Sequence, residues 1–222
     1  MTKKDKGTVG LDVTLTKSEA WIERHAKQLG IILVAVVVVI GGIYLYKHIK
    51  SGQEVEAANA ISKSQTAFMH GQFNLALNGD SVQEKGFLKI IKEYGGTETG
   101  NVAKLYAGLC YVNLGQTDEA IKMLEDFDTQ DDQMVSPLAS VALANCYADK
   151  GDKEKSAELL VKTAKKADND AVSPVCLIQA GELFESLGNN ERALELYNSI
   201  KNDYATSVLA QDIDKYIERA TK

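Results

Sequence analysis

The chain has 222 residues, of which 45% are hydrophobic and 25% charged, and it contains only two prolines. This length and composition are typical of one or two folded domains and exclude a collagen-like, disordered or disulfide-stapled chain. The formal net charge of −6 disfavours nucleic acid as a partner, because there is no basic excess to replace phosphate counterions. Three cysteines are an odd number, so a complete disulfide framework is also excluded.

A stretch of 18 uncharged residues, 29–46 (LGIILVAVVVVIGGIYLY), stands out in the N-terminal quarter. At about 1.5 Å per residue, a helix of this length reaches roughly 27 Å, close to the thickness of a bilayer's hydrocarbon core. Trp21, Tyr44 and Tyr46 suit the two interfaces. A cleaved signal peptide has a shorter apolar segment behind a shorter leader, so we expect an uncleaved transmembrane helix in contact with membrane lipid.

The distribution of basic residues predicts the orientation of this helix. Residues 1–28 contain six basic groups, whereas only Lys47, Lys50 and Lys63 follow closely on the other side. The positive-inside rule therefore places the N-terminus in the cytoplasm and exports the acidic remainder. A capping-box pattern at residues 16–19 predicts a short helix that starts there, and a solvated arm is the alternative. We expect a cytoplasmic arm (1–28), a transmembrane helix (29–46), juxtamembrane helices with a degenerate first repeat (47–96) and a solenoid (97–222).

One unit recurs in the exported part, in the aligned segments 107–124, 143–160 and 180–197. This unit is predicted to be a helix-turn-helix. Its glycine ends the first helix in a left-handed conformation, and its small residue lets the second helix pack close to the first. Repetition of this unit predicts an all-α solenoid. Each unit has an aromatic residue, a turn glycine and a small residue in the same order: Tyr111, Gly115 and Ala120; Tyr147, Gly151 and Ser156; Phe184, Gly188 and Ala193.

Further signals mark the start and the ends of the solenoid. Ser136-Pro137 and Ser173-Pro174 lie 37 residues apart, and each predicts a serine N-cap followed by a first helical proline. Residues 54–94 predict a degenerate first unit, because Gly71 is followed five residues later by Ala76, and residues 86–94 then form an amphipathic helix. Residues 207–220 predict a capping helix with one apolar face: Val208, Leu209, Ile213, Tyr216 and Ile217.

The unit resembles the tetratricopeptide repeat (TPR), a helix-turn-helix motif of 34 residues. The middle unit departs from the motif at its small positions, which are Ala144 and Ser156, and all three units lack the early tryptophan. The matching positions are Gly108, Tyr111, Gly115 and Ala120 in the first unit and Gly181, Phe184, Gly188 and Ala193 in the third.

The order of these parts, together with residues 86–88, Tyr94, 100–108 and 188–189, resembles the family of YfgM-like ancillary subunits of the bacterial SecYEG translocon. The resemblance implies a single-pass protein of the bacterial inner membrane with a periplasmic TPR-like domain. It also implies two partners, the SecYEG translocon and a membrane-anchored, prolyl-isomerase-like chaperone.

Motifs of catalysis and metal binding are missing from the sequence. There is no Walker loop, Rossmann glycine pattern or nucleophile elbow, and His25, His48 and His70 lack the spacing of metal ligands. The acidic run 126–132 lacks the glycine and the closing glutamate of an EF-hand loop. We therefore expect no enzyme activity, no cofactor, no metal site and no small-molecule substrate. Cys110, Cys146 and Cys176 are expected to be semi-buried free thiols, because neighbouring helix axes about 8–10 Å apart are too distant for a bridge.

The first helices of the units are the candidate partner surface, because they line the concave face of TPR-like proteins. Their exposed positions are expected to change from apolar to acidic along the solenoid, ending in Val175, Ile178, Glu182, Glu185 and Ser186. The alternative is that the helices of residues 52–94 cover the apolar stripe as core. The function expected is docking of proteins at the membrane, and the alternative is a structural assembly factor of another envelope complex. The predicted partner-binding residues are Val102, Leu105, Leu109, Val112, Asn113, Leu138, Val141 and Asn145.

Overall fold

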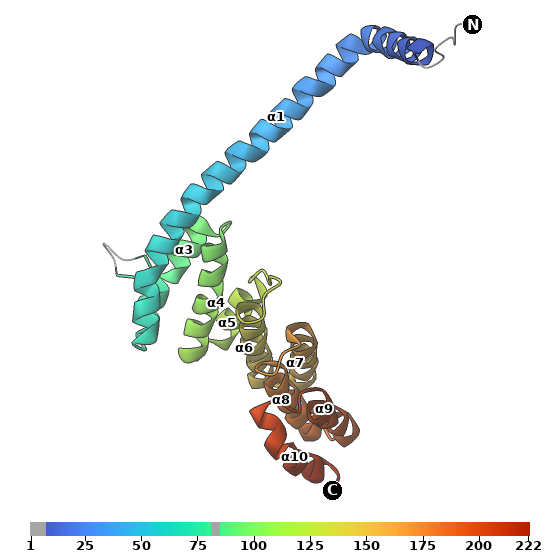
Figure 1. Ribbon diagram of the computed structural model, residues 1–222. Coiled ribbons are helices and arrows are strands. Elements are labelled where there is room, and N and C mark those ends of the chain that lie inside the picture. Colours follow the sequence, from blue (N-terminus) through green and yellow to red (C-terminus); the bar gives the residue numbers. More distant parts are fainter. Residues whose placement is uncertain (1–7, 81–84) are drawn as a thin grey trace, which may run out of the picture. The chain divides into compact units, whose positions relative to one another are not determined.

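The computed structural model describes residues 8–80 and 85–222, and no β-strand occurs in these two ranges (Figure 1). The chain divides into two compact units, residues 1–52 and 53–222. The predicted all-α class is confirmed. In chain order the helices are α1 (Thr8–Met69), α2 (Phe73–Asn78), α3 (Phe87–Tyr94), α4 (Glu98–Asn113), α5 (Thr117–Glu125), α6 (Val135–Asp149), α7 (Lys153–Ala167), α8 (Ser173–Ser186), α9 (Asn190–Asp203), the 3₁₀ helix η1 (Val208–Asp212) and α10 (Ile213–Ala220).

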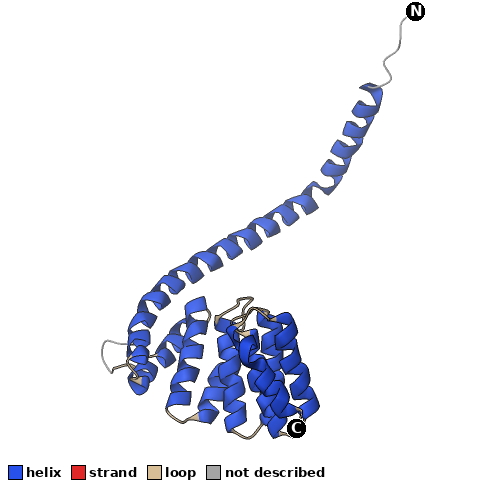
Figure 2. Ribbon diagram, turned by 60° about the horizontal axis from the view of Figure 1, so that its bottom comes forward, coloured by secondary structure: helices blue, strands red, loops and turns tan. Residues whose placement is uncertain are grey.

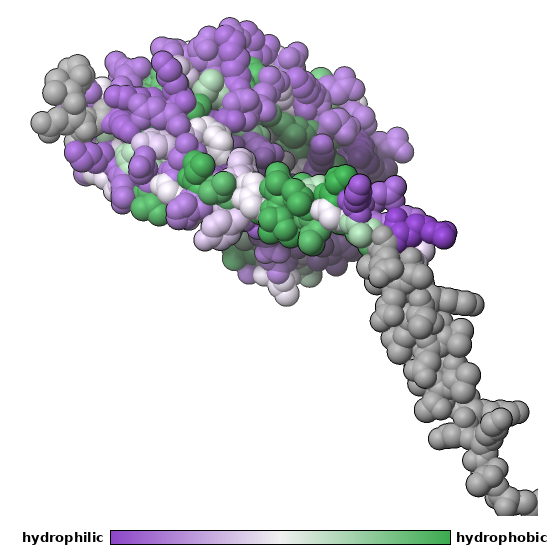
Figure 3. Space-filling model, turned by 90° about the horizontal axis from the view of Figure 1, so that it is seen from above, coloured by the Kyte–Doolittle hydropathy of each residue, from purple (hydrophilic) through white to green (hydrophobic). Residues whose placement is uncertain are grey.

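Helix α1 is a single helix of 62 residues. Within the part of the chain that the structure describes, it is the one helix that is long and apolar enough to cross a membrane. Hydrophobic residues gather along the part of α1 that follows the residues drawn in grey (Figure 3), and the side chains of residues 30–46 are exposed. The predicted helix start at Thr16 is wrong, because α1 begins at Thr8. Helix α1 also continues without a break through residue 46, since neither proline nor a turn sequence follows there.

The degenerate first repeat is formed by the C-terminal part of α1 together with α2. Gly71 has a φ of 72° between the two helices, and Ala76 is completely buried. Helix α3 follows and packs on both α2 and α4. The ring of Tyr106 in α4 lies 5.2 Å from those of both Phe68 and Phe87, between centroids. The predicted helix at residues 86–94 is therefore confirmed, and Gly71 and Ala76 have the turn and buried positions that a first repeat requires.

Three helix pairs follow, α4–α5, α6–α7 and α8–α9, and Figure 2 shows these helices packed side by side. The turn glycines Gly115, Gly151 and Gly188 have φ values of 71°, 89° and 77°, which an L side chain rarely adopts. The small residues that follow them are completely buried in the second helices. A Cβ built on Gly181 would lie 2.3 Å from the ring of Tyr197, so α8 and α9 approach too closely for a larger residue. The predicted helix-turn-helix units are confirmed.

The start of α6 and of α8 differs from the prediction, because the serine before each proline is not the cap. The Asp132 carboxylate accepts hydrogen bonds from the backbone N–H groups of Met134, Val135 and Ser136. The Asn169 side chain accepts from Ala171 and Val172 in the equivalent loop. The two serine hydroxyls are buried and each accepts from the backbone N–H of a loop residue, Gln130 or Asn169. The two serine hydroxyls hold the loops between repeats. Asp132 satisfies N–H groups in the first turn of α6, whereas Asn169 satisfies those of the two residues that precede α8.

The C-terminal cap is a 3₁₀ turn, η1, followed by α10, rather than one continuous helix. Ile213 is completely buried, and Leu209, Tyr216 and Ile217 pack beside it on the core of the last two repeats. Val208 is exposed, so its assignment to the apolar face is wrong. The reason is the 3₁₀ geometry, which rotates residues by a different angle from an α-helix and takes Val208 off the buried face.

Candidate protein-docking surface

The apolar positions predicted on α4 belong to the core of the domain. Leu105 is only 3% exposed and packs with residues of α5, of the loop after it and of α6, among them Leu124 and Phe127. Leu109 is half-buried against the same cluster. Val102 is half-buried against the cluster that contains Phe87 and Ile90 of α3. The helices before α4 thus cover Val102, as the alternative prediction held, while α5 and α6 cover Leu105.

The C-terminal end of α4 leaves two predicted residues exposed. Val112 and Asn113 lie on the surface in the last turn. The Asn113 side-chain amide donates to the carbonyl oxygen of Leu109, 2.8 Å away, within the same helix. At this end of α4 the exposed large apolar side chains are those of Val112 and the C-cap residue Leu114, which is not the predicted stripe.

The exposed apolar surface of the first helices lies instead on α6 and α8. Leu138 is 51% exposed, Val175 is also exposed, and Val141 is half-buried at the core edge. Asn145 is exposed one turn further along α6, whereas Ile178 is buried. A cavity of about 270 Å³ lies between the N-terminal halves of the two helices, and we name it the α6–α8 groove. Its lining residues are Met134, Pro137, Leu138, Val141, Ala171, Val172, Val175 and Cys176.

Part of this groove lies outside the residues predicted from the sequence. Met134, which is 71% exposed, and Ala171 and Val172 precede or cap the helices, and the helix pattern did not include them. A usable signal was present, because the 37-residue offset between the Ser-Pro pairs also relates Met134 to Ala171 and Leu138 to Val175. Successive repeats therefore place equivalent apolar residues side by side at the start of their first helices.

The acidic residues predicted at the far end of α8 form an internal network. Glu185 accepts hydrogen bonds from Nε and Nη2 of Arg219, at 2.8 and 2.9 Å, and from the Tyr197 hydroxyl. Partial burial by itself would raise the pKa of Glu185, but the bonds from Arg219 and Tyr197 hold this pKa below its ordinary value. Glu182 lies 3.5 Å from the same guanidinium. These two carboxylates share the guanidinium of Arg219 and connect α8 to α10.

The three cysteines are free thiols, as predicted, but they are completely buried rather than semi-buried. Burial raises the pKa of Cys110 to about 12 and that of Cys176 to about 11, and it also raises the pKa of Cys146. Thiols held in the protonated form are poor nucleophiles and poor metal ligands. Within the described residues, no cluster of histidine, cysteine and carboxylate side chains has the geometry to hold a metal ion.

A larger cavity, of about 450 Å³, lies between α5, α6 and α7. Its lining mixes buried side chains such as Phe127 with charged ones such as Glu125, Lys162 and Lys166. It contains no exposed large hydrophobic side chain. The α6–α8 groove differs because Met134, Leu138 and Val175 present apolar surface directly to the outside.

Comparisons with known proteins agree with this architecture. The model of the tetratricopeptide repeat-like domain family matches residues 19–213. The chain belongs to this family. Among solved structures it is similar to a Podosopora anserina protein described as a kinesin light chain with nearly identical TPR-like repeats, and to a single-substitution variant of that protein. Each is 13% identical with a TM-score of 0.58; the matches cover 74% of this chain and 84% or 85% of the other, and the likeness shows the fold alone.

No curated protein matches the chain. The TPR-like repeat fold is consistent with protein–protein interaction. The α6–α8 groove is the surface of the repeats that best fits this role, because docking surfaces are concave, apolar at the centre and open to the partner.

Proposed function

We propose that this protein is a single-pass protein of the bacterial inner membrane that docks other proteins through an exported TPR-like domain. Its place is that of an accessory subunit of the Sec translocon. The partners are the SecYEG translocon and a membrane-anchored, prolyl-isomerase-like chaperone or exported chains. The observation that carries the docking function is the open α6–α8 groove, with the apolar side chains of Met134, Leu138 and Val175 exposed on it.

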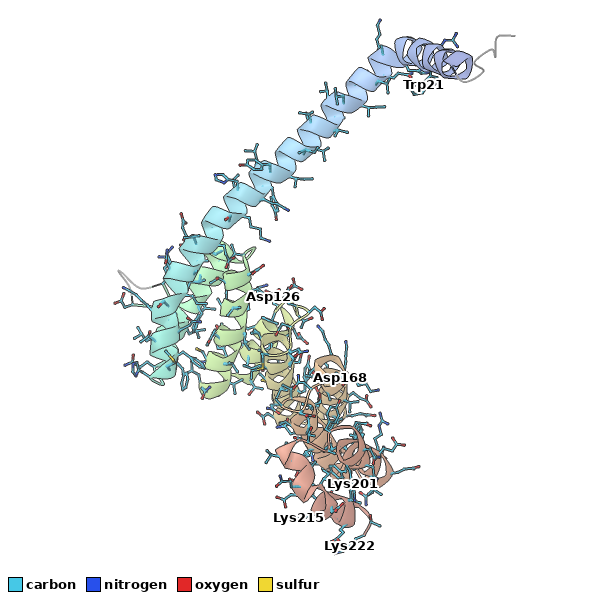
Figure 4. The ribbon with its side chains drawn as sticks, viewed as in Figure 1. Trp21, Asp126, Asp168, Lys201, Lys215 and Lys222 are labelled. Atoms are coloured by element: carbon cyan, nitrogen blue, oxygen red, sulfur yellow. The ribbon has the colours of Figure 1, made fainter. Side chains whose placement is uncertain are left out.

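The membrane part of the proposal is supported by α1. Residues 30–46 expose their apolar side chains along the whole stretch, which water disfavours and lipid does not. Trp21, labelled in Figure 4, and Tyr44 and Tyr46 are exposed near its two ends, where aromatic rings favour the lipid interface. The basic excess of residues 1–28 supports a cytoplasmic N-terminus.

A non-catalytic role is part of the same proposal. The cysteine thiols are buried and protonated, and the carboxylates of the Glu185 network are held by Arg219. Tethering to a membrane raises the effective concentration of weak partners, so a small apolar groove suffices for docking.

The docking surface is tested by photocrosslinking in native membranes. A photoreactive residue replaces Leu138 in the groove, and the matched control replaces Leu187, which has the same side chain and is 47% exposed but lies outside the groove. We expect capture of translocon or chaperone subunits from position 138 and much less from position 187. Capture of other envelope-assembly subunits from position 138 would instead identify a structural assembly factor, and equal capture from both positions would refute docking in the groove.

The orientation is tested separately with single cysteines introduced at two positions in a chain whose native cysteines are left in place. Thr8→Cys and Lys222→Cys lie near the two ends of the described chain. In spheroplasts, a membrane-impermeant maleimide is expected to label position 222 and not position 8. Labelling of position 8 alone would reverse the orientation, and labelling of neither would exclude an exported domain.

A further inference from the structure

The ends of α6 and α8 that border the groove are acidic. Asp131 and Asp132 lie three and two residues before Met134, and Asp168 and Asp170 lie three residues and one residue before Ala171. Asp131 and Asp168 are 37 residues apart and thus occupy equivalent positions in two successive repeats. Figure 4 labels Asp168 at the loop between α7 and α8. Both loops that border the groove therefore bring carboxylates to the same end of it.

These carboxylates are not neutralised by basic side chains. Asp132 bonds to backbone N–H groups and the Ser136 hydroxyl, and Asp170 to the Thr206 hydroxyl. The Tyr204 hydroxyl donates to Asp168. Among the ion pairs of the described residues, none includes Asp131, Asp132, Asp168 or Asp170.

The positive groups at this end are already engaged or directed elsewhere. Lys166 donates through Nζ to the Gln130 carbonyl oxygen, 2.9 Å away, and Lys165 lines a different cavity between α7 and α9. The N-termini of α6 and α8 would attract an anion, but Asp132 accepts from the first N–H groups of α6. In α8 the N–H of Ser173 donates to the backbone carbonyl oxygen of Asn169, and Pro174 has no N–H. Lys166 itself forms no ion pair among the described residues, so its single positive charge stands at this end against the four carboxylates of Asp131, Asp132, Asp168 and Asp170. The excess of negative charge favours a basic ligand over an acidic one.

We propose that the α6–α8 groove takes a peptide segment of a partner protein that combines apolar anchors with lysine or arginine at the end facing the loops 128–134 and 168–172. The apolar residues fill the groove beside Leu138 and Val175, and the basic residues pair with Asp131, Asp168 and Asp170. This rests on the proposed docking function and adds the chemistry of the partner. Exposed carboxylates of this kind select a partner by charge more than they add affinity.

The test uses the full chain in nanodiscs of zwitterionic lipid and three fluorescent peptides. The peptides share one apolar sequence and carry lysine, glutamine or glutamate at the flank. We expect the lysine peptide to bind about tenfold more tightly than the glutamate peptide at low salt, with the ratio falling towards one at about 0.5 M salt. Empty nanodiscs give the background for binding to lipid.

Two variants separate the contributions of charge and apolar surface. A triple variant is expected to abolish the preference for lysine and to leave binding of the glutamine peptide unchanged. It combines Asp131→Asn, Asp168→Asn and Asp170→Asn. The matched control, Glu158→Gln with Glu191→Gln and Asp203→Asn, removes the same charge from positions outside the groove lining and is expected to retain the preference. Met134→Ser, at a side chain too exposed to support the fold, is expected to weaken binding of all three peptides.

The outcomes distinguish this inference from the function on which it rests. Equal binding of the three peptides, or a preference for the glutamate peptide, would overturn the inference about charge and leave docking in the groove intact. Binding of none of the peptides, or binding that Met134→Ser does not weaken, would overturn both.

Discussion

The first helices of the three complete repeats, α4, α6 and α8, differ in what packs against their N-terminal turns. Val102 of α4 packs against α3, whereas its counterparts Leu138 of α6 and Val175 of α8 are exposed. Helix α3 packs on α4 and covers Val102, whereas α5 and α7, which pack on α6 and α8, leave Leu138 and Val175 exposed. The exposure of an apolar residue in a solenoid is therefore set by its neighbouring elements and not by its place in the repeat.

The largest effect expected from this comparison is on stability. Leu105→Ala removes a buried side chain from the core and is expected to lower the free energy of unfolding by about 2–5 kcal/mol. Leu138→Ala, the same change at an exposed position, is expected to cost less than about 1 kcal/mol. Denaturant unfolding of the full chain in nanodiscs measures both. Similar losses for the two variants would mean that Leu138 is also core and the groove is closed.

The next effect concerns the helix starts that border the groove. Asp132→Ala removes the acceptor of three backbone N–H groups of α6 and is expected to lower stability by about 1–2 kcal/mol. Asp131→Ala changes an adjacent carboxylate that belongs to no ion pair and caps no helix, and it serves as the control, with little change expected. If the two variants lost stability equally, capping by Asp132 would not explain the difference from the predicted serine cap.

A smaller effect of opposite sign is expected within the middle repeat. The Ser156 hydroxyl is completely buried with no hydrogen-bond partner, at a position where the other repeats have Ala120 and Ala193. Ser156→Ala is therefore expected to raise the free energy of unfolding by about 1 kcal/mol. Ser173→Ala is the matched control and is expected to lower it, because the hydroxyl of Ser173 donates to Ala164 and accepts from Asn169. Destabilisation by Ser156→Ala would show that this hydroxyl has a partner.

The smallest effect concerns Glu185, near the acidic C-terminal end of α8. The pKa of Glu185 is lower in the folded chain than its ordinary value of 4.5, so the unfolded chain takes up this proton first. The contribution of Glu185 is present above pH 4.5 and is lost as the pH falls through the lower, folded pKa. Thermal unfolding between about pH 6 and pH 3 should show the advantage over Glu185→Gln shrinking with acid. A constant difference would contradict the network with Arg219.

Much of the fold could be predicted from the sequence because its signals are local. The turn glycine and the small residue act within one helix pair, and their recurrence every 36 or 37 residues marks the successive pairs. The structure contains all three predicted pairs. The serine caps were wrong because a carboxylate four residues earlier, Asp132, competes better for the helix N–H groups than a serine hydroxyl. The transmembrane helix was predicted to end at residue 46, whereas α1 continues to Met69, because no stop signal interrupts it there.

The candidate site was harder to predict because it depends on contacts between elements. The apolar stripe of α4 has the same pattern as an exposed docking face, and only the packing of α3, α5 and α6 turns Leu105 and Val102 into core. Leu138 and Val141, which were predicted to bind a partner, line the α6–α8 groove, and Met134 and Val172 line it too although they lie outside the helix periodicity. Asn145 is exposed but does not line the groove.

The central claim, that the α6–α8 groove is a docking site in the membrane, is tested most directly by thiol labelling. Leu138→Cys is compared with Leu187→Cys in native membranes and in the purified chain, and the three native thiols contribute little labelling because they are buried. Labelling at position 138 is expected to be several-fold slower in native membranes than in the purified chain, while position 187 is expected to react at the same rate in both. Equal rates at position 138 in the two preparations would contradict the claim that a partner occupies the groove.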